Sequence, residues 1–392
     1  MRKTVLGLLG LATALFVATG ANAQNTVKIG LIMAYSGQFA DTAAQIDNGV
    51  KLYMKQHGDT VAGKKIELIR KDTGGPNPDV AKRLAQELVV RDGADILAGF
   101  TLTPEALAAS DVSAEAKKFM VIMNAATSII TTKSDFSART SMTLPMIGES
   151  AGTWAVKSGI KKAYTMVSDF GPGHDAEGAF QRAFKAGGGE IIGSVRMPVA
   201  NPDFSAFVQR AKDLNPESIF VFVPGGAQPA ALGKAFAERG IDPNKVKIIG
   251  TGEVVDETAL KSMGNAALGI VTAWHYDYNL DNKMNKEFVK AYNAEFKRNP
   301  DFFSVGGYDG MHLIYETLKK TGGKADGAAL IAAAKGMKWE SPRGSMSIDP
   351  ETRDVIETVY IRRVEKGGDG LVNVVFDKFD NVKDPVKAAM KK

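Results

Sequence analysis

Three features of the sequence predict an α/β fold of two lobes, each built on a parallel sheet covered by helices. Apolar strand-like runs alternate with helical patterns in two successive series, the arrangement of parallel α/β sheets. The chain has 392 residues, more than a single hydrophobic core usually supports. Its last third carries helices and late strands that do not read as a third domain, so we expect it to complete the two sheets.

The first series begins with a buried strand and continues through three strand–helix repeats. Ile46, Val50 and Met54 recur at i, i+4 and i+8, the spacing of one helix face. Strands are expected at 27–33, 66–69, 95–100 and 119–123, and further helices at 79–91 and 104–118.

The second series repeats this order, and its first helix ends at Gly187-Gly188-Gly189, a strong stop signal. Strands are expected at 162–168, 191–197, 218–223 and 246–250, with helices at 175–186, 205–214 and 229–239. In the last third, helices are expected at 284–298 and 310–321, and strands at 355–364 and 371–379.

The N-terminus has the pattern of a secretory signal peptide. Arg2 and Lys3 precede an apolar run from Val5 to Val17, and Ala21-Asn22-Ala23 supplies the small-x-small cleavage pattern. The apolar run is shorter than the roughly 20 residues that span a bilayer. We therefore expect residues 1–23 to be removed near Ala23, which leaves a soluble mature protein in the periplasm.

Composition excludes several classes of function. The chain has no cysteine, which excludes a thiol nucleophile, thiolate metal sites and a lipidated N-terminal cysteine. Its charges are scattered without a basic stripe, so nucleic-acid binding is not expected. The four histidines lack metal-ligand spacing, and Gly250-Thr251-Gly252 lacks the third glycine of a dinucleotide site, so neither metal nor cofactor is expected.

One motif leaves an enzyme class open. Gly148-Glu149-Ser150-Ala151-Gly152 matches the nucleophile elbow of serine hydrolases, and Asp169 and His174 follow in the right order. The motif needs a buried strand before it, whereas 141–146 is weakly strand-like and contains Pro145. Ser150 is more simply placed early in a helix, and the secreted hydrolase stays an alternative.

Several short motifs occur in the order and spacing of one family. They are Ser36-Gly37-Gln38-Phe39, Asp72-Thr73, Ala98-Gly99, Asn124-Ala125-Ala126-Thr127, Phe170-Gly171-Pro172-Gly173 and Tyr308-Asp309-Gly310. Over essentially the whole mature chain the sequence resembles the leucine/isoleucine/valine-binding protein family of type I periplasmic binding proteins. The resemblance implies two Rossmann-like lobes joined by a three-strand hinge, with ligand bound between them. By that analogy lobe one holds 24–143 and 277–350, and lobe two holds 144–276 and 351–392.

The resemblance also implies a function without catalysis. Such a protein is the monomeric solute-binding component of an ABC importer, which closes over a small-molecule carboxylate and delivers it to membrane permease subunits. The same fold serves as the sensory domain of receptors, and that role stays open with a partner protein.

A carboxylate anchor is expected in the first lobe. Thr103 stands where a helix N-cap belongs, with Pro104 at the first helical position, and 124–128 leads into another helix-like start. Free N–H groups at two converging helix starts attract an anion. In the family, the residues matching Thr103, Ala125 and Thr127 hold the ligand carboxylate, and Asn124 lies beside them. The alternative is that the two threonines only cap their helices.

The second lobe departs from the amino-acid-binding pattern. Members that bind amino acids hold the ligand ammonium with a tyrosine and an acid, and the matching positions here are Ala227 and Gly252. A buried ammonium without such partners would be costly. We therefore expect a carboxylic acid without an α-amino group. The neighbouring Gln228 and Glu253 are candidate contacts, and Glu253 could replace the missing acid, so a branched-chain amino acid remains the alternative.

Aromatic residues at expected loops and crossings suggest what the rest of the ligand looks like. Phe39, Phe100, Phe170, Tyr276 and Tyr308 are the candidates. Several rings in one cleft would suit an aromatic or bulky hydrophobic acid. The alternative for each is ordinary core packing.

Overall fold

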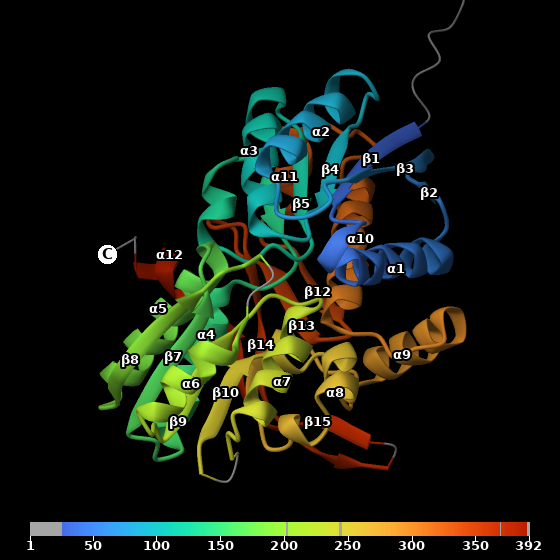
Figure 1. The fold of residues 1–392 in the computed structure, drawn as a ribbon. Coiled ribbons are helices and arrows are strands. Elements are labelled where there is room, and N and C mark those ends of the chain that lie inside the picture. Colours follow the sequence, from blue (N-terminus) through green and yellow to red (C-terminus); the bar gives the residue numbers. More distant parts are fainter. Residues whose placement is uncertain (1–25, 201–202, 243–244, 369, 390–392) are drawn as a thin grey trace, which may run out of the picture.

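The described part of the chain comprises residues 26–200, 203–242, 245–368 and 370–389 of a computed structural model, and it forms two α/β lobes (Figure 1). The expected signal peptide, residues 1–23 with cleavage near Ala23, lies outside the described residues. Within the described ranges, no helix is both long enough and apolar enough to cross a membrane.

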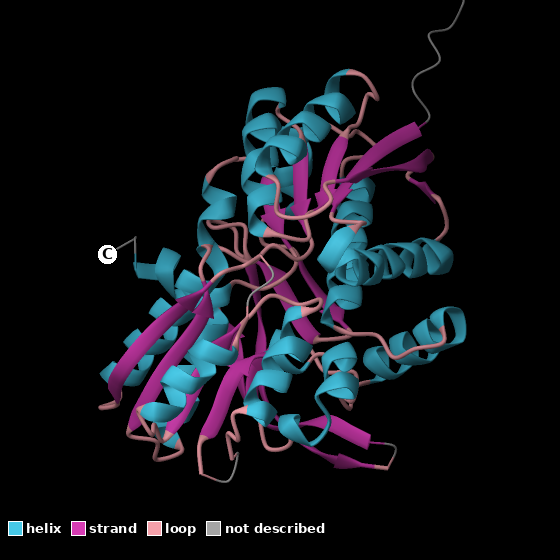
Figure 2. Cartoon of the chain, viewed as in Figure 1, coloured by secondary structure: helices cyan, strands magenta, loops and turns pink. Residues whose placement is uncertain are grey.

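The first lobe is a six-stranded sheet with helices on both faces (Figure 2). Its strands are β1 (Thr26–Met33), β2 (Thr60–Val61), β3 (Lys64–Asp72), β4 (Ile96–Gly99), β5 (Phe119–Ile122) and β6 (Ser137–Arg139). Its helices are α1 (Ala40–His57), α2 (Pro78–Val90), α3 (Thr103–Ala116), α9 (Lys283–Phe296), α10 (Phe302–Lys320) and α11 (Gly327–Ala334). The strand order is β2-β3-β1-β4-β5-β6, parallel except for the β2–β3 pair.

The first lobe is held together by two apolar layers, one on each face of this sheet. Leu31 and Met33 of β1 pack in the layer that includes α1 and α10, whereas Ile32 packs in the layer of α2 and α3. This division follows from the two-residue period of a strand. A parallel strand covered on both faces has to be apolar throughout, which explains the continuous apolar run that marks β1 in the sequence.

The second lobe is a nine-stranded mixed sheet. Its strands are β7 (Lys162–Ser168), β8 (Glu190–Met197), β9 (Ser218–Phe222), β10 (Lys247–Thr251), β11 (Val271–Trp274), β12 (Lys338–Ser341), β13 (Gly344–Ile348), β14 (Val355–Gly367) and β15 (Gly370–Val382). Its helices are α4 (Leu144–Lys157), α5 (Gly171–Ala186), α6 (Ser205–Asp213), α7 (Gln228–Glu238), α8 (Glu257–Met263) and α12 (Pro385–Ala389). The order is β12-β13-β14-β11-β10-β9-β7-β8, with β15 paired to β14.

The two lobes differ from the expected parallel sheets at their late strands. β14 runs antiparallel to β11, and β15 and β13 pair antiparallel with β14, so the second sheet is parallel only from β11 to β8. The hairpin β12–β13, expected with lobe one, joins this sheet because the first residues of the long strand β14 pair with Ser347 and Ile348. Helix α10 also starts at Phe302, earlier than expected, after an N-cap at Asp301.

The chain passes between the lobes three times, through 140–143, 275–282 and 335–354. The last of these segments contains the β12–β13 hairpin, which joins the edge of the second sheet. The buried guanidinium of Arg343 joins these crossings. It donates to the carbonyl oxygen of Thr140, to Glu357 Oε2 at 2.9 Å and to Asp309 Oδ2 at 2.9 Å. Its Nη1 also lies 2.6 Å from His275 Nδ1. We call these five residues the hinge cluster.

Burial lowers the pKa of His275 well below its usual value, and the positive charge of Arg343 adds to the effect. The imidazole is therefore neutral and accepts the hydrogen bond from Arg343 at Nδ1. One buried cation thus holds together a residue from each crossing.

Candidate functional site

Two threonine hydroxyls meet at the carboxyl ends of neighbouring strands of the first lobe. Thr103 begins α3 after β4, and Thr127 lies in the loop after β5. Their Oγ1 atoms are 2.9 Å apart, and both residues are buried. The two junctions that the sequence singles out therefore lie side by side.

The helix starts at these junctions differ from the expectation in two ways. Leu102 is the N-cap of α3, and Thr103 is its first helical residue. After Thr127 the chain makes only a five-residue 3₁₀ segment, Ser128–Thr132, which has no helix dipole of useful length. The second helix N-terminus near the hydroxyl pair belongs to the other lobe.

That second N-terminus is the start of α5. A Cβ atom placed on Gly171 would lie 2.9 Å from Thr127 Oγ1 and 3.7 Å from Thr103 Cγ2. The N-cap Phe170 makes no side-chain hydrogen bond to the helix. The first N–H groups of an α-helix have no partners within the helix and carry partial positive charge. The hydroxyl pair therefore lies between the starts of α3 and α5, a setting that attracts an anion.

Arg139 is fully buried and supports the loop after β5 that carries Ala125 and Thr127, which we call the anchor loop. It donates to the carbonyl oxygens of Ala125 at 2.9 Å and Thr127 at 2.7 Å, and to Asp354 Oδ1 at 3.0 Å. These bonds engage two carbonyl oxygens that would otherwise repel an anion. The N–H of Ala125, expected to hold a carboxylate, donates instead to the carbonyl of Phe100 at 3.0 Å.

The hydroxyl pair borders a small cavity between the lobes. Residues of both lobes line it: Thr101, Leu102, Thr103, Asn124, Ala125, Ala126, Leu144, Phe170, Pro172, Phe222, Pro224 and Glu253. Its volume is about 20 Å³. Benzene occupies engineered cavities of about 150 Å³, so a ring requires the lobes or their side chains to move apart.

Of the residues expected at the site, the structure brings six together. Thr103, Asn124, Ala125, Phe170 and Glu253 line the cavity, and Thr127 is hydrogen-bonded to Thr103. The amide of Asn124 donates to the carbonyl of Thr101 at 2.7 Å, so this side chain positions the neighbouring loop.

Five expected residues do not line the cavity. Phe100 has a φ of 67°, and its ring packs in the core between α2 and α3. Tyr308 lies within α10, where its hydroxyl donates to Gln56 at 2.7 Å. Tyr276 donates to Asn285 at 2.9 Å inside the hinge region.

The other two lie near the lobe interface. Gln228 is buried and donates to the carbonyl of Val199 at 2.6 Å. Phe39 packs on Leu102 and faces Gly226 of the other lobe, where an added Cβ would lie 3.4 Å from its ring. Phe39 is therefore buried between the lobes beside the cavity, and the Gln228 amide is engaged by the main chain of its own lobe.

Sequence reasoning missed several lining residues, chiefly Leu144, Pro172, Phe222 and Pro224. Phe222 ends strand β9, and Pro224 follows it. Carboxyl ends of parallel strands are where such sheets bind ligands, so the strand boundary was a usable signal. Phe222 and Pro224 lie at such a strand end and not at a crossing, which is why a reading of loops and crossings alone does not single them out.

The serine of the elbow-like motif lies inside a helix. Ser150 is part of α4, and its hydroxyl donates to the carbonyl of Met146 at 2.8 Å. The two glycines of the motif let α4 approach α5: Cβ atoms on Gly148 and Gly152 would lie 2.4 Å from Ala176 O and 2.7 Å from Phe180 O. The pattern is thus explained by helix packing, and the strand-to-helix elbow of a hydrolase is not formed.

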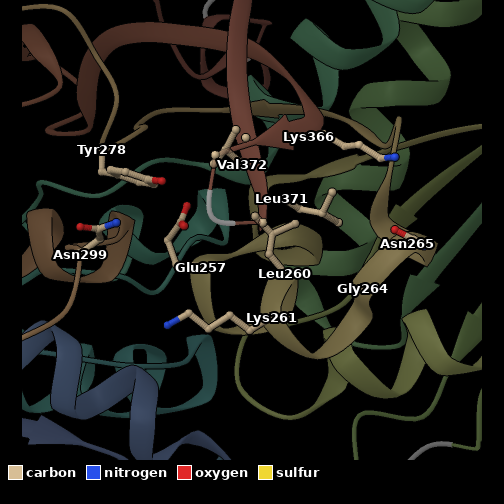
Figure 3. Close-up of a pocket in the computed structure, with 13 residues that line it drawn as sticks. Glu257, Leu260, Lys261, Gly264, Asn265, Tyr278, Asn299, Lys366, Leu371 and Val372 are labelled. Carbon is tan, nitrogen blue, oxygen red and sulfur yellow. The ribbon is translucent and has the colours of Figure 1, made fainter.

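A larger hollow lies elsewhere, between α8 and the β14–β15 hairpin (Figure 3). Its volume is about 810 Å³, and its walls carry Glu257 together with Lys261 and Lys366. The hydroxyl pair does not line this hollow, which is separate from the small cavity described above. Within the described residues, no group of three metal-ligating side chains is present either.

Two buried carboxyls, Asp256 and Asp301, line a separate small pocket. Asp256 caps α8 by accepting from the N–H groups of Thr258 and Ala259, and Asp301 caps α10 by accepting from Ser304 at 2.9 Å. Burial raises the pKa of Asp256 to about 7 and that of Asp301 to about 6. Among the described residues Asp301 Oδ2 has no hydrogen-bond partner.

Asp301→Asn is expected to make stability less dependent on pH. The folded-state pKa of about 6 lies above the unfolded value of about 3.9. The native state therefore holds this proton more tightly, so its stabilisation is complete below pH ~4 and is lost as pH rises through ~6. Asparagine keeps the cap and does not titrate. Denaturant unfolding at pH 4.5, 5.5 and 6.5 measures the slope.

The matched control is Asp281→Asn, on an exposed loop where Lys286 lowers the pKa of the carboxyl. It should leave the slope above pH 4.5 unchanged. An unaltered slope in Asp301→Asn would contradict the prediction.

The fold and the site together define a bilobal binding protein. Two α/β lobes, linked by three crossings, enclose a cavity with an anion-attracting wall. The chain belongs to the periplasmic binding protein family, whose model matches residues 26–369.

Individual relatives agree with this assignment. Leu/Ile/Val-binding protein homolog 6 of Brucella melitensis is 40% identical over 389 residues, 98% of this chain and 99% of the relative. A solute-binding protein of an ABC transporter from Rhodopseudomonas palustris BisB5, solved with 3,4-dihydroxybenzoic acid, is 56% identical with a TM-score of 0.90, covering 93% of this chain and 99% of that one. Another from strain HaA2, solved with p-hydroxybenzoic acid, is 40% identical with a TM-score of 0.90, covering 93% and 100%.

Proposed function

We propose that this protein is the periplasmic solute-binding component of an ABC importer and that it captures a benzoate-type aromatic acid. The observation that carries the proposal is the hydroxyl pair Thr103–Thr127 between the starts of α3 and α5. A carboxylate there would replace the bond between the two hydroxyls and accept one hydrogen bond from each. Lobe closure over the ligand would present the form that permease subunits recognise.

The remainder of the lining favours a ring over an amino acid. Phe170, Phe222 and Pro224 offer apolar surface, and burial of apolar area contributes about 25 cal/mol per Å². In the described part of the lining, Glu253 is the single carboxyl that could pair with an ammonium, and burial keeps it largely neutral, with a pKa of about 8. The ligands solved in the Rhodopseudomonas relatives, 3,4-dihydroxybenzoic acid and p-hydroxybenzoic acid, support the same class.

A branched-chain amino acid is the second candidate, favoured by the Leu/Ile/Val-binding homologues. Titration calorimetry of the mature protein with benzoate, 4-hydroxybenzoate, 3,4-dihydroxybenzoate and leucine separates the two. We expect micromolar or tighter binding of at least one aromatic acid and none of leucine. The reverse result would replace our proposal with the amino-acid alternative.

We expect the protein to bind its ligand as a monomer. Neither catalysis nor a cofactor is needed. Ligand-induced compaction in small-angle scattering without turnover of the aromatic acid is the expected behaviour.

Thr127→Val is expected to weaken aromatic-acid binding by about 1–3 kcal/mol, the cost of leaving a charged group without one of its hydrogen bonds. Valine keeps the shape of threonine, so the loop should fold normally. Thr132→Val is the control, since that hydroxyl donates to the carbonyl of Ile129 at the exposed end of the same segment. Equal affinities of both variants and the unaltered protein would mean that Thr127 only supports the loop.

A further inference from the structure

The cavity has one buried acid, and it lies on the wall opposite the hydroxyl pair. Glu253 follows β10 in the second lobe, whereas Thr103 and Thr127 belong to the first. Glu253 is 6% exposed and lines the cavity beside Phe222 and Pro224. An acid that is gripped at one lobe and extends toward the other would bring the far edge of its ring to Glu253.

Glu253 has little else to bind within its own lobe. Its Oε2 accepts a hydrogen bond from Thr251 Oγ1 at 3.3 Å, a long contact. A buried carboxyl with one weak partner retains hydrogen-bonding capacity that only a group inside the cavity can use.

We propose that Glu253 determines which aromatic ring is accepted, an inference that rests on the proposed function. Its carboxyl forms a hydrogen bond with a hydroxyl group on the ring of the bound benzoate. The solute class is then a hydroxybenzoate, and unsubstituted benzoate is discriminated against because it leaves Glu253 buried with a bond unmade.

The protonation of Glu253 is consistent with this role. Burial raises its pKa to about 8, the hydrogen bond from Thr251 opposes the rise, and the negative charge of Asp256 adds to it. Asp256 is in turn influenced by Asp301 of α10 and Asp41 of α1. Two cations face the same acids: Arg298 pairs with Asp41, and Arg362 of β14 interacts with Asp256. A neutral carboxyl both donates and accepts, which matches a phenolic hydroxyl, and it does not repel the ligand carboxylate.

The first test compares 4-hydroxybenzoate with benzoate by titration calorimetry on the mature protein at pH 7. The unaltered protein should prefer 4-hydroxybenzoate by roughly tenfold or more. Glu253→Gln, which is neutral and keeps a donor and an acceptor, should retain most of this preference. Glu253→Leu should lose it while binding benzoate at least as well as before.

The second test uses proton uptake and does not depend on the leucine variant folding. A carboxylate bound in the same cavity should raise the pKa of Glu253 further, so binding at pH 8 should take up a fraction of a proton. Calorimetry in buffers of different ionisation enthalpy measures this uptake. It should vanish in Glu253→Gln, and affinity for either acid should fall above pH ~8 in the unaltered protein only.

The outcomes separate this inference from the proposed function. If no aromatic acid binds the unaltered protein, the proposed function fails and the inference with it. If aromatic acids bind but Glu253→Leu keeps the preference for 4-hydroxybenzoate, or loses both ligands equally, the role of Glu253 is overturned while the proposed function stands. Proton release on ligand binding, or proton uptake that persists in Glu253→Gln, also overturns the proposed role of Glu253.

Discussion

Replacing Arg343 by methionine is expected to lower the free energy of unfolding by about 3–5 kcal/mol, the usual cost of removing one partner from a buried ion pair. Arg343 is 2% exposed and neutralises Asp309 and Glu357, which would be left buried without a cation. Burial already raises the pKa of Glu357 to about 8 despite Arg343. The loss should therefore be greater at pH 8 than at pH 5, where Glu357 can take up a proton.

Urea unfolding at the two pH values measures this effect. The control is Arg363→Met on the same strand β14, where an exposed pair with Glu365 should contribute less than about 1 kcal/mol. Similar losses in the two variants, or a loss independent of pH, would show that the hinge cluster is not the electrostatic centre that its geometry indicates.

Replacing Gly171 by alanine is expected to weaken aromatic-acid binding by roughly ten- to a hundredfold, about 1.4–2.8 kcal/mol. The new methyl group would lie 2.9 Å from Thr127 Oγ1 and 3.3 Å from its Cγ2, so the lobes could not close fully. Overpacking of this kind usually costs about 1–3 kcal/mol. Because the clash occurs between lobes, an open molecule avoids it, and the melting temperature without ligand should hardly change.

Calorimetry measures the loss of affinity in Gly171→Ala, and small-angle scattering measures whether the variant still closes over the ligand. Gly178→Ala is the matched control in the same helix: its methyl group would meet Arg182 Nη1 at 3.2 Å, the movable end of a flexible side chain. It should bind and compact like the unaltered protein. Full compaction of Gly171→Ala with ligand would mean that α5 does not approach the anchor in the bound state.

Most of the fold could be predicted from the chain alone because its strands are buried on both faces. Runs such as Ile29–Met33 are apolar throughout and flanked by clear helix signals, so most elements of both series could be predicted. The short strands β2, β6, β11, β12 and β13 could not, because they draw their stability from pairing within the sheet rather than from their own sequence. The antiparallel return of β14 and β15 likewise depends on tertiary pairing that periodicity does not reveal.

The anchor was easier to predict than the rest of the site. Thr103 and Thr127 follow adjacent strands, so sheet geometry alone brings them together. The rings were harder, because a phenylalanine or tyrosine after a strand can turn toward the core as readily as toward the cavity. Tyr308 illustrates the limit, since α10 begins six residues earlier and carries it into contact with α1.

The lining of the cavity is divided between the lobes. The first lobe contributes the hydroxyl pair and the start of α3, and the second contributes the start of α5 together with Phe222, Pro224 and Glu253. We call these last three residues the second wall. Because of this division, one set of residues would bind the carboxylate of the ligand and another would determine which aromatic ring is accepted. Substitutions confined to the second wall would retune which aromatic acid is recognised without rebuilding the anchor. The two parts of the site can therefore be changed independently. A set of fluorescent sensors for related acids could keep the same hydroxyl pair and the same lobe closure and differ only in the second wall.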